Sequence, residues 1–263
     1  RGSTNANRSV FVANSRFVPG YFFRMQASHV DIQNLHFAGE SVKLLGSGLV
    51  VSNLTMTNRI GPNVNLSLEL RGDNSRFKDV QLDRGTLSLS GTNNRIERLF
   101  QRWGATTLSG TNLYLLNSVV YATNQNAIAV DATVDLSVIS NCTVVASKGT
   151  ALRKRGAGLL WSGHDILVAG GSDANSVIEW ESGNLLSDWN NLFARDSAWI
   201  GSQRGKWEKL AYWQLASGQD ANSVSFDPAS SFQNEGDGDF HLNSKTGRWS
   251  PLLNRWDTDT VHS

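Results

Sequence analysis

One short phrase, in which apolar and polar residues alternate on either side of an asparagine, recurs along most of this chain. Its clearest copy runs from His29 to Phe37: Val30 and Ile32 alternate with polar residues before Asn34, and the alternation then resumes in the opposite phase. A period of two is typical of a short strand with one buried face. The interruption recurs about every 19 to 26 residues, at Asn14, Asn34, Asn53, Asp79, Arg98, Asn117, Asn141, Asp165 and Asn191.

The spacing of the phrases determines how the strands can pair. A second apolar phrase lies between consecutive interruptions, as at Leu66–Leu70, Leu87–Leu89 and Ile128–Val130, and glycine, asparagine and serine cluster between phrases. Each repeat of roughly 22 residues therefore holds two or three short strands and no helix. A single repeat cannot cover its own apolar residues, whereas the repeats above and below it can. The sequence predicts an all-β chain that winds as a parallel β-helix solenoid of about nine coils.

The polar residue at each interruption is predicted to be a turn residue whose side chain bonds its equivalent one coil away. Such a ladder would satisfy polar groups that are otherwise buried and unpaired, at about 1 to 3 kcal/mol each. Arg98 does not fit this pattern, so we expect an irregular stack there. The predicted ladder comprises Asn14, Asn34, Asn53, Asp79, Asn117, Asn141, Asp165 and Asn191.

The repeat ends near residue 196. We therefore predict a β-helix over residues 1–196 and a C-terminal cap and tail over residues 197–263. An amphipathic helix in the tail would cover the last coil, which otherwise exposes strand edges and apolar side chains. The residues that predict this helix and its end are Trp207, Leu210, Ala211, Leu215 and the stop signal Gly218.

The bulk composition excludes several classes of function. With 263 residues, 40% of them apolar, and a formal charge of +1, the chain can bury a core but has no electrostatic basis for binding nucleic acid or an anionic membrane. No apolar run reaches the roughly 18 to 20 residues that insert across a bilayer. The single cysteine, Cys142, excludes an internal disulfide and falls at an apolar position, where we expect a buried, inert thiol. The chain begins abruptly at Arg1, so we interpret it as part of a longer protein.

Two features resemble a known superfamily. The phrase repeated over residues 10–194 resembles the coil of the right-handed parallel β-helix in the pectate-lyase-like superfamily. The tail segments Trp213–Ser223, Asp227-Pro228 and Gly238–Leu242 resemble the C-terminal end of bacterial extracellular β-helix repeat proteins. The resemblance implies a right-handed solenoid, an extracellular or cell-surface location and a longer parent chain. It implies no single activity, because this architecture carries lyases, hydrolases, esterases, epimerases, adhesins and non-catalytic modules.

The densest basic patch, Arg153-Lys154-Arg155, is the candidate catalytic site. The resemblance implies that a polysaccharide lyase of this fold uses a lysine or arginine base beside a uronate, together with a cation such as calcium. Lys154 would be the base, and Arg153 or Arg155 would hold the carboxylate. A solvated basic turn is the simpler interpretation, because no cluster of aspartates accompanies the patch as a calcium site. Glu179 and Glu181, two residues apart on a strand, are a further candidate pair for glycoside hydrolysis.

The remaining signal is aromatic. Nine tryptophans is a high number, and Trp103, Trp180 and Trp199 fall outside the apolar columns of the repeat. Exposed rings along a groove are typical of surfaces on which sugar rings stack, so these three are the candidate carbohydrate-binding residues. Calcium is the candidate cofactor, and the acidic segment Glu235–Asp239 has the oxygen ligands for it. That segment is shorter than an EF-hand loop, so a plain acidic turn explains it better, and we predict no dedicated metal site.

These observations favour an extracellular or cell-surface module that presents an elongated face to a polysaccharide without catalysis. The alternative is a polysaccharide lyase that acts on a uronate-containing glycan with Lys154 as base. A third interpretation is architectural: the chain would be a spacer in a larger surface protein.

Overall fold

The computed structural model describes residues 9–12, 16–17, 22–39, 41–57, 66–132, 136–242, 248–250 and 255–257. Its compact units are residues 1–225 and residues 226–263, and each is described here by itself. Unit 1 is a parallel β-solenoid of about seven turns, so the predicted fold class is confirmed and the predicted count of nine coils is too high. That count included the phrase at Asn14, which lies outside the described residues.

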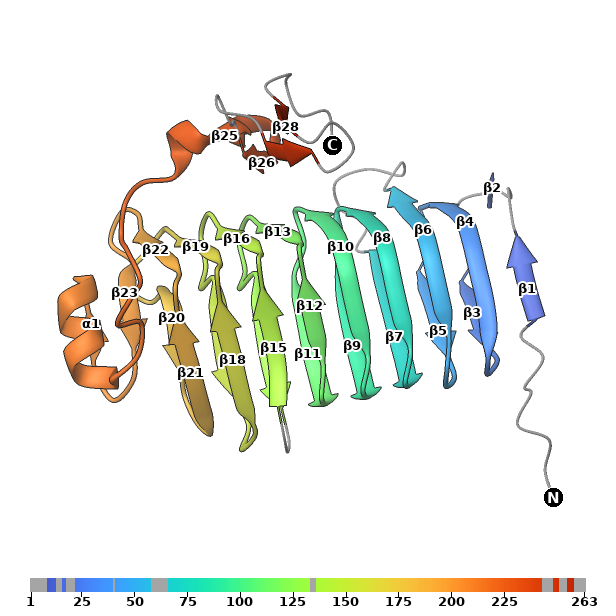
Figure 1. Cartoon of the computed structure of the whole chain (residues 1–263), viewed down its shortest axis with the longest axis horizontal. Coiled ribbons are helices and arrows are strands. Elements are labelled where there is room, and N and C mark those ends of the chain that lie inside the picture. Colours follow the sequence, from blue (N-terminus) through green and yellow to red (C-terminus); the bar gives the residue numbers. More distant parts are fainter. Residues whose placement is uncertain are drawn as a thin grey trace. The chain divides into compact units, whose positions relative to one another are not determined.

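Sheet A of unit 1 contains the phrases that identified the repeat, and each strand pairs in parallel with its equivalent one coil away (Figure 1). The period-two alternation places one set of side chains inside the solenoid and the other outside. Its strands are β1 (Ser9–Val12), β2 (Arg16–Phe17), β4 (Val30–Ala38), β6 (Val50–Thr57), β8 (Arg76–Asp83), β10 (Arg95–Arg102), β12 (Tyr114–Leu116), β13 (Val119–Ala122), β15 (Leu136–Ser140), β16 (Thr143–Ala146), β18 (Leu159–Gly163), β19 (Ile166–Ala169), β21 (Asn184–Asp188) and β22 (Asn191–Ala194).

Sheet B contains the second set of apolar phrases and is parallel except at its end, where β23 and β24 pair antiparallel. Its strands are β3 (Phe23–Gln26), β5 (Val42–Leu45), β7 (Leu66–Asp73), β9 (Gly85–Thr92), β11 (Thr106–Thr111), β14 (Ile128–Ala132), β17 (Leu152–Arg155), β20 (Ser176–Trp180), β23 (Trp199–Ser202) and β24 (Lys206–Trp207). Because β23 and β24 continue this sheet, the solenoid extends beyond the boundary predicted at residue 196, and the two units divide after Ser225.

The core is a stack of fully buried apolar columns between the two sheets. In sheet A one column passes in register from strand to strand, and each member covers the one below it. This nearest-neighbour burial is the stabilisation that the sequence pattern predicted. The column consists of Ile32, Val51, Phe77, Ile96, Leu115 and Ile139.

The polar ladder lies on the surface rather than in the core. Asn34 and Asn53 have φ of 57° and 56°, the left-handed conformation that asparagine tolerates, and the Asn53 amide donates to Asn34 Oδ1 at 2.6 Å. Arg98 continues the ladder instead of interrupting it, because its guanidinium donates to both carboxylate oxygens of Asp79 at 2.6 and 2.7 Å. Asn117 and Asn141 also have positive φ and are exposed, so these side chains contribute turn geometry and not the satisfaction of buried groups.

The sequence did not identify a second ladder in the turns that lead from sheet B to sheet A. Asn74, Asn93 and Asn112 all have positive φ. The Asn93 amide donates to Asn74 Oδ1 at 3.1 Å, and the Asn112 amide donates to Asn93 Oδ1 at 3.0 Å. The signal was present as the asparagines of the Asp73-Asn74, Asn93-Asn94 and Thr111-Asn112 turns.

The predicted ladder residues Asp165 and Asn191 do not occupy the left-handed turn position. His164 and Trp189 do, with φ of 61° and 62°. Asp165 is instead buried, and its Oδ1 accepts the backbone N–H of Cys142 at 2.8 Å. The shift by one or two residues turns a polar side chain inward, where it bonds an amide of the preceding coil that would otherwise be unpaired.

The Cys142 thiol is buried as predicted, and burial raises its pKa well above its ordinary value, with a further contribution from Asp165. Thiolate is the reactive form, so we expect no labelling of the native protein by a maleimide over hours at pH 7 and complete labelling in denaturant. Mass spectrometry measures both. Rapid labelling of the folded chain would contradict the buried position.

The end of the solenoid is covered by α1 (Leu210–Ser217) and the segment that follows it. The helix ends at Gly218, whose φ of 68° fits the predicted stop signal. The predicted inward face is confirmed for Trp207 and Leu210, which pack against the core, and is wrong for Leu215, which is 87% exposed. The helix residue with no exposed surface is Trp213. Trp213 packs directly on Gly201 of β23, where a Cβ atom would lie 2.1 Å from the indole ring.

In the part of unit 2 that the structure describes, the strands form two short antiparallel hairpins. In the first, the rings of Phe232 and Phe240 pack edge to face with centroids 5.1 Å apart. The acidic segment Glu235–Asp239 begins as a 3-10 turn, in which the Asn234 amide donates to Asp237 Oδ2 at 2.7 Å. The hairpins consist of β25 (Phe232–Asn234) with β26 (Asp239–Leu242) and β27 (Arg248–Ser250) with β28 (Arg255–Asp257); η1 (Ala229–Ser231) and η2 (Glu235–Asp237) are the 3-10 turns.

Candidate functional site

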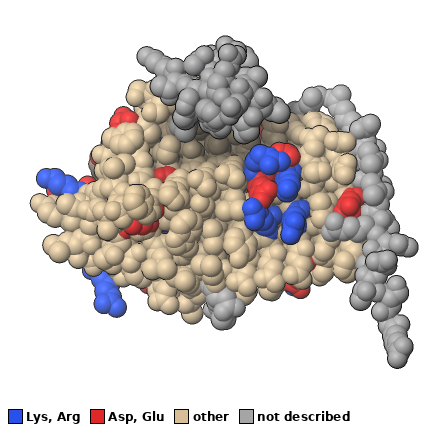
Figure 2. All heavy atoms as spheres, in the orientation of Figure 1, with Lys and Arg blue, Asp and Glu red and all other residues tan. Residues whose placement is uncertain are grey.

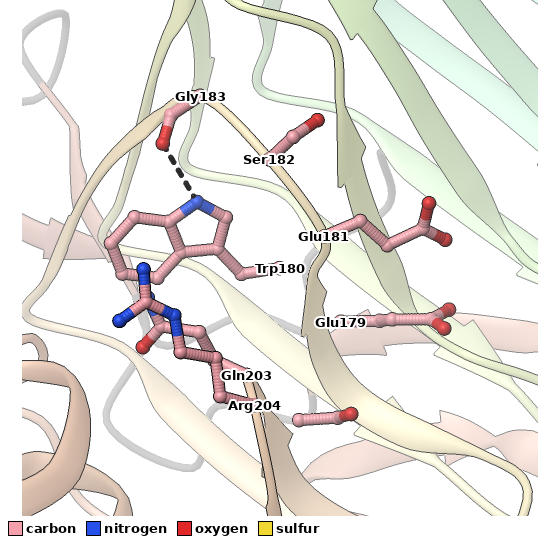
Figure 3. Close-up of a pocket in the computed structure, with 8 residues that line it drawn as sticks. Glu179, Trp180, Glu181, Ser182, Gly183, Gln203 and Arg204 are labelled. Atoms are coloured by element: carbon pink, nitrogen blue, oxygen red, sulfur yellow. Dashed lines mark hydrogen bonds between the residues drawn. The ribbon is translucent and has the colours of Figure 1, made fainter.

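A pocket of about 590 Å³ lies at the ends of β20 and β23, which are neighbours in sheet B (Figure 3). One aromatic ring, two carboxylates, one guanidinium and several hydrogen-bonding groups line it. The lining residues are Glu179, Trp180, Glu181, Ser182, Gly183, Ser202, Gln203 and Arg204.

The strand register brings the predicted basic patch beside this pocket. Arg153 lies opposite Glu179, and Lys154 lies opposite Trp180, although these residues are 26 positions apart in the chain. Arg153 Nε is 3.3 Å from Glu179 Oε2, and the same guanidinium forms a close ion pair with Glu181. Arg155 is held separately by both carboxylate oxygens of Asp131, at 2.7 and 2.9 Å. Both arginines of the patch are therefore paired with carboxylates.

Lys154 does not face the pocket or solvent. Its side chain has no exposed surface, and its ammonium donates to the backbone oxygens of Arg155 and Gly156 at 2.8 Å and of Ser182 at 3.2 Å. Burial lowers the pKa of this ammonium, and the nearby Asp131 charge opposes the shift. Through these hydrogen bonds Lys154 connects the turn after β17 with the turn after β20. The turn after β20 lines the pocket. A side chain held inside the solenoid cannot take a proton from a polysaccharide, so this placement does not fit the predicted role of Lys154 as base.

The sequence contained a signal for the inward direction of Lys154. Leu152 and Lys154 are two residues apart, and so are Ile128 and Val130 on the strand one coil before. A period of two places both members of each pair on the same face. The charge of Lys154 favours the opposite direction, because buried lysines are rare.

Glu179 and Glu181 share the outer side of the strand. Figure 3 shows both side chains pointing the same way, while Trp180 between them points to the other side. Burial raises the pKa of Glu179 above its ordinary value, although the charge of Arg153 opposes the shift. The Glu181 carboxylate makes the closer contacts with Arg153, through both Nε and Nη2. One guanidinium therefore holds two carboxylates in different surroundings.

The three predicted carbohydrate-binding tryptophans lie in three different environments. Trp180 lines the pocket, and its indole N–H donates to the Gly183 carbonyl at 3.0 Å. The other two lie outside the pocket lining. Trp103 follows β10, and the guanidinium of Arg102 lies 4.7 Å from the centre of its ring. The indole N–H of Trp199 donates to the Asp173 carbonyl at 2.8 Å.

A second candidate surface lies on the outer side of sheet A. On β8 and β10 this side presents charged residues such as Lys78 and Glu97, which pair at 3.4 Å. From β12 to β21 it presents mainly apolar residues, although Asn184 and Asp188 lie on the same side of β21, and Leu186 is 51% exposed. Figure 2 shows the charged atoms gathered over β8 and β10, with a broad area of other residues beside them. We call Tyr114, Leu116, Leu136, Val138, Leu159, Trp161 and Leu186 the apolar face.

Three aromatic rings lie along one edge of the apolar face. The ring centres of Trp161 and His164 are 6.3 Å apart, and those of His164 and Trp189 are 6.4 Å apart with the two planes within 21° of parallel. Trp189 is 57% exposed. Beside it, Asp188 accepts hydrogen bonds from the backbone N–H and the side-chain amide of Asn222, both at 2.7 Å. We call Trp161, His164 and Trp189 the ring row.

The repeat pattern does not distinguish the ring row, because Trp161 and Trp189 each stand at an apolar position of the repeated phrase. The signal was the run Trp189-Asn190-Asn191, in which two neighbouring asparagines could each be the interruption. The structure places Asn190 inside and Trp189 at the exposed turn position.

Comparison with known proteins finds no matching family model, no matching curated protein and no matching solved structure. Within the described ranges, no group of three or more histidine, cysteine, aspartate or glutamate side chains is arranged to hold a metal ion. The helices in the described part of the chain are too short or too polar to cross a membrane. The functional argument therefore depends on the geometry of the pocket and of the outer face of sheet A.

Proposed function

We propose that this chain is a polysaccharide-binding module of an extracellular or cell-surface protein, and that the apolar face with its ring row is the binding surface. The observation that carries the proposal is the change of the outer side of sheet A from charged to apolar and aromatic residues, with Leu186 and Trp189 more than half exposed. Contiguous exposed apolar surface is uncommon and marks interaction sites. Aromatic rings beside hydrogen-bonding side chains suit a sugar, which has apolar C–H faces and polar hydroxyl edges.

The arrangement of the surface suits an extended polymer. Neighbouring strands of a sheet lie about 4.8 Å apart, so the four strands β12, β15, β18 and β21 present side chains at regular intervals along the solenoid axis. A polysaccharide chain that lies along this axis would contact one row of side chains after another. At the edge of the face, Asp188 and Asn222 offer a carboxylate and an amide for sugar hydroxyls.

The pectate-lyase-like assignment stays a hypothesis that is supported by the repeated phrase and by the solenoid. The lyase alternative has less support, because Lys154 is enclosed by carbonyl groups and the neighbouring arginines are paired with carboxylates. The spacer interpretation predicts that no polysaccharide binds.

Replacing Trp189 with asparagine tests the binding surface. Asparagine tolerates the left-handed conformation at this position, as Asn34 and Asn53 do, so the substitution removes the ring without straining the backbone. We expect about two- to tenfold weaker binding, since one aromatic contact is worth about 0.5 to 1.5 kcal/mol. Affinity electrophoresis against a panel of neutral and acidic polysaccharides, with and without calcium, measures the change.

Tyr212→Ala is the matched control, because Tyr212 is a half-exposed aromatic residue on α1, outside the apolar face. Its affinity should equal that of the unmodified chain. Equal losses of affinity in both variants would contradict the assignment of the binding surface. If the unmodified chain bound no polysaccharide of the panel, the spacer interpretation would be favoured.

A further inference from the structure

The outer side of sheet A carries opposite charges at the two ends of the apolar face. In their first three residues, β8 and β10 present Arg76, Lys78, Arg95 and Glu97 outward. Glu97 pairs with Lys78 at 3.4 Å and forms a close ion pair with Arg95, so positive charge remains in excess at this end. Figure 2 shows these charged atoms as a compact group. At the other end, β21 presents the carboxylate of Asp188 on the same side.

The strand register places the charged and the apolar residues in two common rows. In a parallel sheet each residue lies beside its equivalent one coil away, so a row of side chains runs along the solenoid axis. The first row consists of Arg76, Arg95, Tyr114, Val138, Trp161 and Leu186, and the second row consists of Lys78, Glu97, Leu116, Ser140, Gly163 and Asp188.

These rows are complementary to themselves about one two-fold axis. The middle strands of the series β8, β10, β12, β15, β18 and β21 are β12 and β15. If two copies face each other about an axis that runs parallel to the strands between β12 and β15, each row meets the same row of the second copy in reverse order. Arg76 then faces Leu186 of the second copy, and Lys78 faces Asp188 of the second copy. An axis along the solenoid would instead bring the cations of β8 against each other, where they repel.

The remaining contacts of this arrangement are also favourable. Arg95 faces Trp161 of the second copy, and a guanidinium over an indole ring is already present in this chain at Arg102 and Trp103, 4.7 Å apart. Leu186, which is 51% exposed, becomes covered, and apolar surface leaves water. Six strands about 4.8 Å apart span only about 24 Å, so the interface belongs to the small, reversible class below about 1,200 Å².

We propose that a second copy of this chain covers the outer side of sheet A through this two-fold arrangement, and that it competes with polysaccharide for the apolar face. The competition rests on the proposed function, whereas the dimer follows from the two rows alone. Free chains pair and so shield their apolar faces from other surfaces. A polysaccharide that occupies the face separates the two copies.

Sedimentation equilibrium of the whole chain, from about 10 µM to about 1 mM, tests the dimer over the range of weak complexes. Leu186→Lys sets a second cation against Arg76 of the other copy, and Arg76→Glu sets a carboxylate beside Asp188 of the other copy. Each should weaken the dimer at least tenfold, because like charges then meet at two symmetric places. The double variant Arg76→Glu/Leu186→Lys restores opposite charges at the facing positions, so it should recover the dimer.

Arg71→Glu is the matched control, because it makes the same change in net charge at an exposed arginine on β7, on the outer side of sheet B. Its dimer should be as strong as that of the unmodified chain, and circular dichroism verifies that all the variants are folded. Three results would overturn the interface: no dimer at about 1 mM, no recovery in the double variant, or equal losses in Arg71→Glu and Arg76→Glu.

The competition is tested by adding the polysaccharide of the panel that binds most tightly. The dimer should dissociate as the polysaccharide saturates the chain. A dimer that persists with polysaccharide bound would show that the two partners use different surfaces and would overturn the competition. If no polysaccharide binds, the proposed function and the competition are both overturned, whereas the sedimentation of the variants still decides the dimer interface.

Discussion

Asp165→Asn is expected to remove a decline in stability of about 4 kcal/mol between pH 4 and pH 8. Burial raises the pKa of Asp165 from its ordinary 3.8 to about 7 in the folded chain, so the folded state holds a proton there that the unfolded state has released. The stability that this proton contributes is fully present below pH 3.8 and is lost as the pH rises through 7. The magnitude follows from a shift of about three pKa units at 1.36 kcal/mol each.

Asparagine suits the position because it keeps both hydrogen bonds of the carboxyl group. Its oxygen can accept from the Cys142 N–H, and its amide can donate to the Ser162 hydroxyl, which now bonds Asp165 at 2.9 Å. Asn190 already does the equivalent one coil later, where its oxygen accepts from the Asp165 N–H and its amide donates to the Ser187 hydroxyl. The variant should therefore be the more stable protein at pH 8.

Urea unfolding at pH 5, 6, 7 and 8 measures the effect. The urea concentration at the midpoint is plotted against pH for the unmodified chain and for Asp165→Asn, and the two curves are compared. Asp79→Asn is the control: this exposed carboxyl has a pKa lowered by its hydrogen bond with Arg98, so it titrates below the measured range. The control curve should run parallel to that of the unmodified chain. If the Asp165→Asn curve also ran parallel to that of the unmodified chain, the Asp165 carboxyl would not be protonated in the folded state.

Trp213→Ala is expected to destabilise unit 1 by about 3 to 5 kcal/mol, the usual cost of removing a buried tryptophan side chain. The indole packs on Gly201, and its N–H donates to Asp220 Oδ2 at 2.9 Å. Asp220 has no exposed surface, and its other oxygen accepts from the hydroxyls of Ser187 and Ser223 at 2.9 and 2.8 Å. Removal of the indole would therefore leave both a cavity and an unpaired carboxylate oxygen at the last coil.

Thermal unfolding followed by circular dichroism measures the loss, and light scattering measures the association that exposed strand edges promote. Leu215→Ala is the control on the same helix, because that side chain is 87% exposed and should change stability by less than about 0.5 kcal/mol. A larger loss in Leu215→Ala than in Trp213→Ala would contradict the exposed position of Leu215.

The repeated phrase was sufficient to predict the parallel solenoid, because the strands and turns of each coil are determined by residues that are close together in the sequence. In Val30–Phe37 the period of two separates a buried face from an exposed face, and Asn34 at the reversal tolerates the left-handed backbone that the turn needs. Each coil then buries its apolar residues against the next, so the same pattern predicts strands, turns and their stacking together. The position of the turn could not be predicted where two polar residues adjoin, as at Asn190 and Asn191.

The candidate sites could be predicted only in part. The sequence identified Arg153, Trp180, Glu179 and Glu181 as separate candidates, and the structure brings them together because β17 and β20 are adjacent in sheet B. Their contacts depend on register between strands that are 26 residues apart, and a pattern within one repeat does not contain that register.

The sequence by itself determined which residues alternate, where turns form in the regular repeats up to Asn141 and that the strands stack in parallel, since these depend on neighbours along the chain. Only the tertiary structure decided which three carbonyl groups hold the Lys154 ammonium and that Trp189, not Asn190, is exposed beside His164. The physical reason is that both outcomes depend on hydrogen-bond partners one coil away. A polar side chain turns inward where a backbone N–H or C=O group of the neighbouring coil would otherwise be buried without a hydrogen-bond partner.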